Sequence, residues 1–226
     1  MSLWHPKRVF PPPSGNPIVE LLHKFKGLWF SNSSWPTNIV SNGIGGYGYI
    51  NWYPDRVELN SGDSASSYSW VRKDAPSFAT AYSWNRKRYL SVHITTGGSY
   101  LYTYTYYQVV SGNMQITLDF PNPLRHIGFK LIAGNLYGTV GNGTSESTLL
   151  LETWPANTPV SKKLECVLEP GVECRFYVDG VDKGALTTNL PSGTTDANIM
   201  FYAAVLTNHT YNKKLNIYEV RVFQEE

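Results

Sequence analysis

The chain has 226 residues, a formal net charge of +2 and 14% aromatic residues, among them 16 tyrosines and 7 tryptophans. This length fits one all-β sandwich or two small domains, and either could bury a core without a metal or a disulfide. So small a net charge argues against nucleic acid or an anionic membrane as the partner. No run reaches the roughly 18 apolar residues that cross a bilayer, and we expect no encoded signal peptide because the first residues carry no apolar core.

Residues 1–15 are expected to form an extended arm, because Pro6 and the three prolines at 11–13 favour polyproline II backbone. The apolar side chains on this arm are Trp4, Val9 and Phe10. They imply that the arm packs on another surface, either this chain's own sandwich or a neighbouring subunit.

A short helix is predicted over residues 16–27. Asn16 suits the N-cap, Pro17 suits the first helical position, and Gly27 is a stop signal. Because so short a helix is marginal alone, it is expected to dock, covering one end of the sandwich.

From residue 28 onward the pattern predicts strands and turns only, because apolar and polar residues alternate with period two. The last strand is expected to return and pair with the first. The expected strands are 28–30, 47–52, 56–60, 64–72, 78–84, 89–94, 99–107, 114–120, 127–132, 136–140, 148–152, 164–168, 174–178, 197–206 and 214–223, with one more strand that follows the turn at 178–180 and ends at Leu190 and Pro191.

One predicted strand, 99–107, carries a tyrosine at every second position, so these side chains share one face. They are Tyr100, Tyr102, Tyr104 and Tyr106. Facing the core, four phenol hydroxyls would need partners; facing solvent, the stripe would form a contact surface for a sugar or a protein, which we favour. Trp52, Trp70 and Trp84 are further candidates for stacking on sugar rings, although a core position is the more common role of a tryptophan.

The two cysteines, Cys166 and Cys174, flank a predicted hairpin turn. If Pro170 centres that turn, they lie directly opposite each other, and a cross-strand disulfide is geometrically allowed. The alternative is two buried thiols that act as small hydrophobic groups. Two cysteines supply too few ligands for a metal site.

Two stretches carry a resemblance to a known fold family. The sequence FYVDG at 176–180, followed by TTNLPSG at 187–193, resembles a hairpin of concanavalin A-like (laminin-G-like) jelly-roll domains. Such domains occur in phage and archaeal-virus structural proteins and in carbohydrate-binding modules. The stretch FKLIAGNLYG at 129–138, with NGTSEST at 142–148, resembles the hairpin that accompanies it. The resemblance implies an all-β jelly-roll β-sandwich as a single domain over 16–226, with the short helix and the extended arm at its N-terminus.

We predict no enzymatic activity and no cofactor. Retaining glucanases of this fold class need two carboxylates about 5 Å apart, commonly on one strand as E-x-D-x-x-E, and that pattern is absent. The five histidines are scattered without metal-ligand spacing, and no hydrolase elbow or phosphate-binding loop occurs. A glycoside hydrolase is therefore the least supported function.

Two hypotheses follow. The first is a non-enzymatic structural protein of a virus or phage particle, as a capsid, decoration or appendage subunit, in a homo-oligomer or with other virion proteins. The alternative is a lectin-like carbohydrate-binding module with a glycan partner. Either places the chain in a virion or at an extracellular surface.

Overall fold

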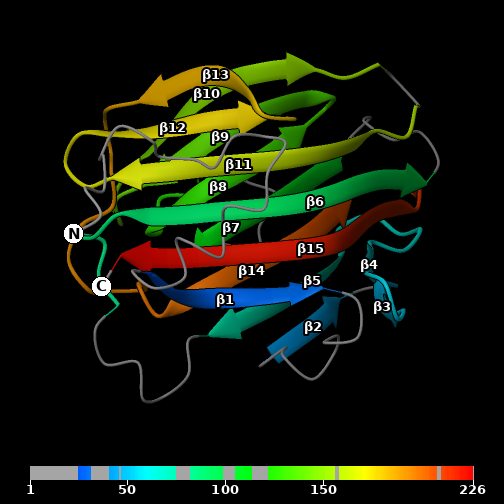
Figure 1. Cartoon of the computed structure of the whole chain (residues 1–226). Helices are drawn as coiled ribbons and strands as arrows, with labels where there is room; N and C mark the ends of the chain where they lie inside the picture. Colours follow the sequence, from blue (N-terminus) through cyan, green and yellow to red (C-terminus); the bar gives the residue numbers. More distant parts are fainter. Residues whose placement is uncertain are drawn as a thin grey trace.

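Two antiparallel sheets stacked face to face make up the molecule (Figure 1). The computed structural model describes residues 25–31, 41–45, 47–74, 82–98, 105–113, 122–155, 158–207 and 210–225. Sheet A contains, in order, β13 (Val181–Leu186), β12 (Glu173–Val178), β11 (Ser161–Glu169), β6 (Arg88–Gly98), β15 (Lys213–Glu225), β4 (Val57–Asn60) and β3 (Tyr49–Trp52), with β1 (Phe25–Ser31) also paired to β15. Sheet B contains, in order, β10 (Glu146–Thr153), β9 (Asn135–Gly141), β8 (His126–Ile132), β7 (Thr105–Gly112), β14 (Ile199–Thr207), β5 (Ser67–Asp74) and β2 (Ser41–Gly45).

The core lies between the sheets and follows from the alternation in the sequence. In β12, for example, Cys174, Phe176 and Val178 are buried, whereas Arg175 and Tyr177 between them are half-buried on the outer face. Successive side chains of a strand point to opposite faces, so one face of each sheet is apolar and meets the other sheet. The strands predicted on this basis in the C-terminal half are confirmed, except that the strand expected to end at Leu190 and Pro191 ends at Leu186.

An edge-to-face ring pair joins the two sheets at the centre of the core. Phe129 on β8 and Phe176 on β12 have ring centroids 5.8 Å apart at an interplanar angle of 80°. The residue beside them must be glycine, because a Cβ on Gly138 would lie 2.6 Å from the Phe176 ring. The two stretches that carried the family resemblance therefore meet through their side chains.

The predicted closure of the sandwich is confirmed. β15 pairs with β1 over its C-terminal half, from Ser31↔Glu219 to Phe25↔Glu225, and with β6 on its other side. In Figure 1 the red β15 accordingly runs between the green β6 and the blue β1.

The helix prediction is wrong at its C-terminal end. Residues 25–27 belong to β1, where Phe25, Lys26 and Gly27 pair with Glu225, Gln224 and Phe223. A ladder along a whole neighbouring strand satisfies more backbone groups than the last turn of a marginal helix. Residues 16–24 and the predicted arm at 1–15 lie outside the described residues. The described residues contain no helix capable of crossing a membrane.

Other predicted boundaries shift by small amounts. The turn between β8 and β9 is centred on Ala133 and Gly134, one residue earlier than predicted, and both have positive φ. The strand predicted over 78–84 is wrong at its end, since 82–84 form an irregular segment and a turn. Residues 78–81 lie outside the described part of the chain.

The register of the β11–β12 hairpin corrects the expected arrangement of the cysteines. Cys166 pairs with Phe176 and Cys174 pairs with Leu168, so the two cysteines are diagonal neighbours and do not face each other. The loop at 170–172 is closed by the Glu169↔Glu173 pair, which moves its centre from Pro170 to Gly171. Both cysteines are free, fully buried thiols, the alternative left open by the sequence.

We expect neither thiol to react with Ellman's reagent in the native protein at pH 8, and both to react once denaturant unfolds it. Burial raises the pKa of Cys174 well above its usual value, so the reactive thiolate is scarce. Rapid labelling of the native protein would contradict the burial, and silence after unfolding without reductant would reveal a disulfide.

Candidate functional site

The three predicted tryptophans do not share a surface. Trp84 is fully buried, and its indole Nε1 donates a hydrogen bond to the Thr195 carbonyl oxygen at 2.9 Å. Trp52 on β3 packs against the main core. Trp70 lies on the outer face of sheet B, stacked on Tyr202 with ring centroids 5.2 Å apart. Trp84 therefore cannot contact a ligand from the surface.

The tyrosine stripe stays a prediction. Tyr100, Tyr102 and Tyr104 lie outside the described residues, and Tyr106 is placed only by its backbone, which pairs with Leu206 and Ile132 in sheet B. Tyr107, on the opposite face of β7, is 2% exposed and belongs to the core.

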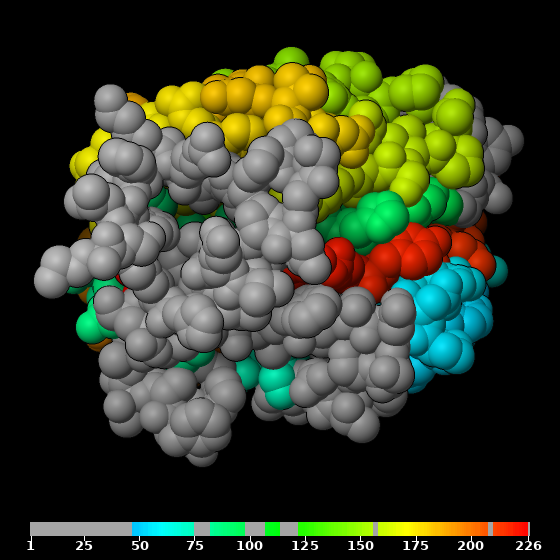
Figure 2. Space-filling view, viewed as in Figure 1, coloured from blue at the N-terminus to red at the C-terminus, as the bar shows by residue number. Residues whose placement is uncertain are grey.

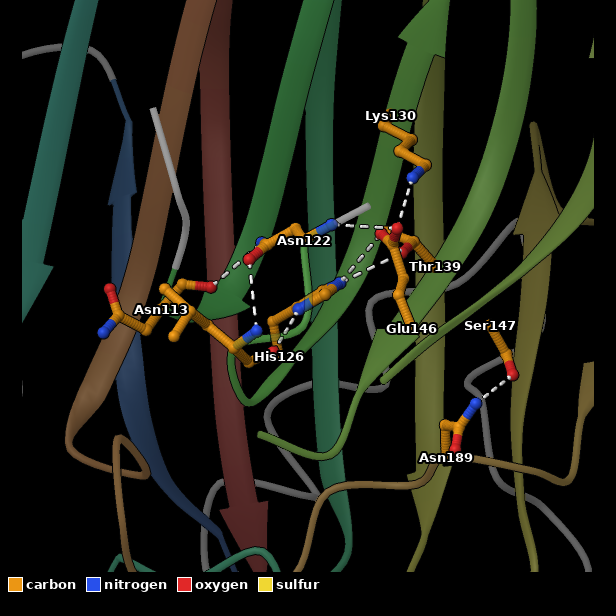
Figure 3. A network of polar contacts seen from close by, with 9 residues as sticks. Asn113, Asn122, His126, Lys130, Thr139, Glu146, Ser147 and Asn189 are labelled. Carbon is orange, nitrogen blue, oxygen red and sulfur yellow. Dashed lines mark hydrogen bonds and ion pairs between the residues drawn. The ribbon is translucent and has the colours of Figure 1, made fainter. Parts of the chain in front are cut away.

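A cluster of polar side chains links β8, β9 and β10 at one end of sheet B (Figure 3). The Lys130 ammonium contacts Glu146 Oε2 at 2.6 Å, and the Thr139 hydroxyl donates to Glu146 Oε1 at 2.5 Å. His126 Nε2 lies 3.0 Å from the same hydroxyl, while its Nδ1 lies 2.7 Å from the Leu124 carbonyl oxygen. We call His126, Lys130, Thr139 and Glu146 the buried network.

This network is sealed from solvent. The side chains of His126, Lys130 and Glu146 are 0%, 4% and 2% exposed. Burial lowers the pKa of His126 to about 4, so its ring is neutral at pH 7. Lys130 neutralises the only carboxylate in the cluster, and a sealed site with one neutralised carboxylate lacks the acid and base pair that glycoside hydrolysis needs.

A second polar cluster lies where the loop after β9 meets the loop after β13. Asn142 Nδ2 donates to Asn189 Oδ1 at 3.2 Å, and Asn189 Nδ2 donates to Ser147 Oγ at 2.9 Å, near Thr188. These groups satisfy one another, and the Asn142 oxygen also accepts from two backbone amides of its own loop. The cluster therefore holds loops in place and presents few free groups to a ligand.

Exposed aromatic side chains gather elsewhere, at the β3 edge of sheet A. Among the described residues, the large aromatic side chains that are clearly exposed are Tyr47 at 70% and Tyr49 at 37%. Figure 2 shows this segment, in cyan with β4, at the surface of the molecule. Asn212 Nδ2 donates to the Tyr49 hydroxyl at 3.4 Å, which brings the turn before β15 onto the same surface.

The backbone beneath these tyrosines is tightly packed. Ser61 N donates to the Lys213 carbonyl oxygen at 2.9 Å, and Lys213 N donates back to Ser61 Oγ at 3.0 Å. Gly62, with φ of +75°, lies so close to the tyrosine segment that a Cβ would be 2.3 Å from the Tyr47 carbonyl oxygen. Only glycine fits there, and its position fixes the loop that carries Tyr47.

Beneath this surface lie buried polar groups whose hydrogen bonding is incomplete. Asn60 Nδ2 and Asn212 Oδ1 are buried and have no hydrogen-bond partner in the described part of the chain. Burial lowers the pKa of the neighbouring Lys213 to about 8. Buried polar atoms without partners and a shifted pKa are both enriched at functional sites. We call Tyr47, Tyr49, Asn60, Asn212 and Lys213 the β3 corner.

Sequence reasoning missed the β3 corner. Tyr47 and Tyr49 were assigned to a strand without a role, and nothing local links them to Asn212, which is 163 positions from Tyr49. The alternation of Tyr47 and Tyr49 around Gly48, after a glycine-rich stretch, was the available signal. Within the described residues, no group of three or more His, Cys, Asp or Glu side chains could hold a metal ion.

Comparison with solved structures identifies the fold. A carbohydrate recognition domain of Emp47p superposes with a TM-score of 0.59 at 12% identity, covering 90% of this chain and 98% of that one. A protein of unknown function from Shewanella oneidensis gives 0.55 at 10% identity, with 96% and 97% coverage. The chain has a concanavalin A-like jelly-roll fold.

Toxin binding domains share this jelly-roll fold. A structure of botulinum neurotoxin type C, described as depending on two ganglioside molecules to enter cells, superposes with a TM-score of 0.57 at 12% identity. It is matched over 92% of this chain but only 50% of its own length, so the present chain spans about half of that relative. No family model matches the sequence, and no curated protein matches it.

Proposed function

We propose that this jelly-roll domain is a lectin-like module that binds a glycan at the β3 corner. The observation that carries the proposal is the exposure of Tyr47 and Tyr49, with the Asn212 amide beside the Tyr49 hydroxyl. Exposed rings cost free energy unless they meet a ligand or a partner, and a sugar ring offers both an apolar face and hydroxyl groups.

The residue types of the β3 corner suit that ligand. The tyrosine rings can stack on the C–H face of a pyranose, while amide groups exchange hydrogen bonds with its hydroxyls. The half-buried amide of Asn212 supplies such a group, since its Nδ2 donates to the Tyr49 hydroxyl at 3.4 Å, whereas Asn60 is fully buried and lies beneath the contact surface. Two nearby cations are paired, Arg56 with Asp55 at 2.9 Å and Lys214 with Glu58 at 3.3 Å, which favours recognition by stacking and neutral hydrogen bonds.

The solved relatives support this choice over the role in a virus particle, because one of them is itself described as a carbohydrate recognition domain. A sequence identity of 12% supports a shared fold but does not allow any binding residue to be transferred to this chain. The proposed location of binding therefore rests on the β3 corner alone. The particle role, the homo-oligomer and the extracellular or virion location stay predictions.

A glycan array followed by calorimetry tests the proposal. The wild-type chain is expected to bind at least one glycan, and Tyr47→Ala and Tyr49→Ala are each expected to weaken that affinity about tenfold or more, or roughly 1.4 kcal/mol. Because Tyr47 is 70% exposed, its removal leaves the fold intact.

A matched control removes exposed apolar side chains at the far edge of the sandwich. Leu150→Ala on β10 and Val181→Ala on β13 remove side chains of residues 53% and 57% exposed, and neither should alter glycan affinity. No glycan bound, or equal affinity in all four variants, would refute a site at the β3 corner.

A further inference from the structure

The hydrogen bonds of the buried network do not close with the protons that its groups ordinarily carry. The Nδ1 atom of His126 faces a carbonyl oxygen at 2.7 Å, so it must carry a proton and donate it. In a neutral ring Nε2 is then a bare acceptor, 3.0 Å from the Thr139 oxygen. Glu146 Oε1, another acceptor, lies 2.5 Å from that oxygen on its other side.

The Thr139 hydroxyl has one proton and two acceptors that need it. If the proton points to Glu146, two acceptors face each other at the His126 contact. If it points to His126, the same conflict arises at the shorter Glu146 contact. The other carboxylate oxygen, Glu146 Oε2, cannot supply the missing proton, because it is itself an acceptor. The Lys130 ammonium and the backbone N–H of Asn122 already donate to it, at 2.6 and 3.0 Å.

We propose that His126, Thr139 and Glu146 form a proton-binding site, in which one proton taken from solvent completes the hydrogen-bond chain. The added proton joins His126 Nε2, which donates to the Thr139 oxygen, and the Thr139 proton goes to Glu146 Oε1. Every donor and acceptor of the chain then has one partner.

The surroundings set when this proton is taken up. Glu146 on β10 favours the charged ring, whereas burial and the Lys130 ammonium on β8 oppose it. Opposite His126, the paired residues are Gly112 on β7 and Gly141 on β9, which carry no charge, and the Arg125 guanidinium is next to Gly143. Uptake is therefore expected near pH 4, where the pKa of His126 is held by its burial.

The same groups hold the segment 122–125. Glu146 accepts from the Asn122 amide, and His126 donates to the Leu124 carbonyl oxygen. Proton uptake at Nε2 keeps both of these contacts and adds a positive charge to the ring that donates to Leu124. The proton-binding site is independent of the β3 corner, because its residues lie on β8, β9 and β10 of sheet B, whereas β3 is an edge strand of sheet A.

Nitrogen NMR of the histidine rings in the full chain, from pH 7.5 to pH 3.5, tests this inference. His126 is expected as the Nδ1–H tautomer at neutral pH and to gain a proton on Nε2 with a midpoint near pH 4. Thr139→Val, which removes the acceptor for that proton, should lower the midpoint by about one pH unit, while Thr139→Ser should retain the wild-type midpoint.

Two results would overturn the proposal. One is an Nε2–H tautomer of His126 at neutral pH. Nε2 would then already donate to the Thr139 oxygen, and no added proton would be needed there. The other is an unchanged midpoint in Thr139→Val, which would reduce the threonine to a packing role. If Thr139→Val does not fold, the tautomer in the wild-type protein and the midpoint of Thr139→Ser still decide the question.

Discussion

Replacing Glu146 with leucine is expected to lower the free energy of unfolding by about 4 kcal/mol, because it leaves the Lys130 ammonium buried without its counter-charge. The pair is close, at 2.6 Å, and its side chains are 4% and 2% exposed. The loss of the contact to Asn122 N adds an unsatisfied backbone donor. Chemical denaturation of the wild type and the variant, followed by tryptophan fluorescence, measures the change.

The double variant Glu146→Leu with Lys130→Leu separates the charge effect from simple loss of contacts. Removing both charges eliminates the uncompensated cation, so the double variant should recover a large part of the loss and be more stable than Glu146→Leu alone. A matched control is Glu173→Leu, which breaks an exposed pair with Arg175 whose side chains are 29% and 37% exposed. That change should cost less than 1 kcal/mol. Equal losses in the buried and exposed pairs would contradict the argument.

The strands and turns of the C-terminal half could be predicted because each is encoded locally. In β12 the residue type at every second position states which face is buried, and Asp179–Gly180 supplies the two positive φ values of a tight hairpin turn. Pairing of β15 with β1 could also be expected. An unpaired last strand would leave its backbone groups exposed at a sheet edge, and pairing with the first strand covers them. Local patterns of this kind determine the architecture.

Details that depend on one residue of register could not be predicted. A loop centred on Pro170 fits the sequence as well as the observed loop centred on Gly171, and this shift of one residue moves the partner of Cys166 by two positions, from Cys174 to Phe176. Gly171, with φ of +69°, settles that choice only once the strands are paired. Prediction of facing cysteines failed for this reason.

The groups of the two proposed sites were the hardest to foresee, because they come together only in three dimensions. Lys130 occupies an outward position of β8, where period-two patterning predicts exposure, yet it is 4% exposed and pairs with Glu146 from another strand. Similarly, Asn212 meets Tyr49 across two thirds of the chain. Polar residues at such positions look alike in sequence whether they are solvated or paired.

Arg88 is the second residue whose removal should be costly. It lies between the sheets and is fully buried, donating to the Ala197 carbonyl oxygen at 2.5 Å, to Gln224 Oε1 at 3.1 Å and to Ser111 Oγ at 3.3 Å. Its guanidinium also lies 4.1 Å from the centroid of the Trp84 ring. One side chain therefore ties β7, β15 and the loop before β14 to the start of β6.

We expect Arg88→Ala to lower the free energy of unfolding by about 4 kcal/mol, since it leaves a cavity and strips a buried carbonyl oxygen of its donor. Arg88→Met should cost clearly less. Burial lowers the pKa of Arg88 to about 9, so the folded state bears a penalty for holding the charge, and methionine fills the space without it.

Comparing the free energies of unfolding of Arg88→Ala and Arg88→Met tests how Arg88 stabilises the fold. It separates the contribution of filled space and hydrogen bonds from that of the positive charge. Arg175→Ala serves as the control, because that arginine is 37% exposed and should cost less than 1 kcal/mol. Above pH 9 the folded protein releases the Arg88 proton before the unfolded chain does. The wild type should therefore gain stability relative to Arg88→Met as the pH rises from 9 toward 11. A methionine variant as unstable as alanine, with no such relative gain, would show that the charge of Arg88 is fully compensated in the core.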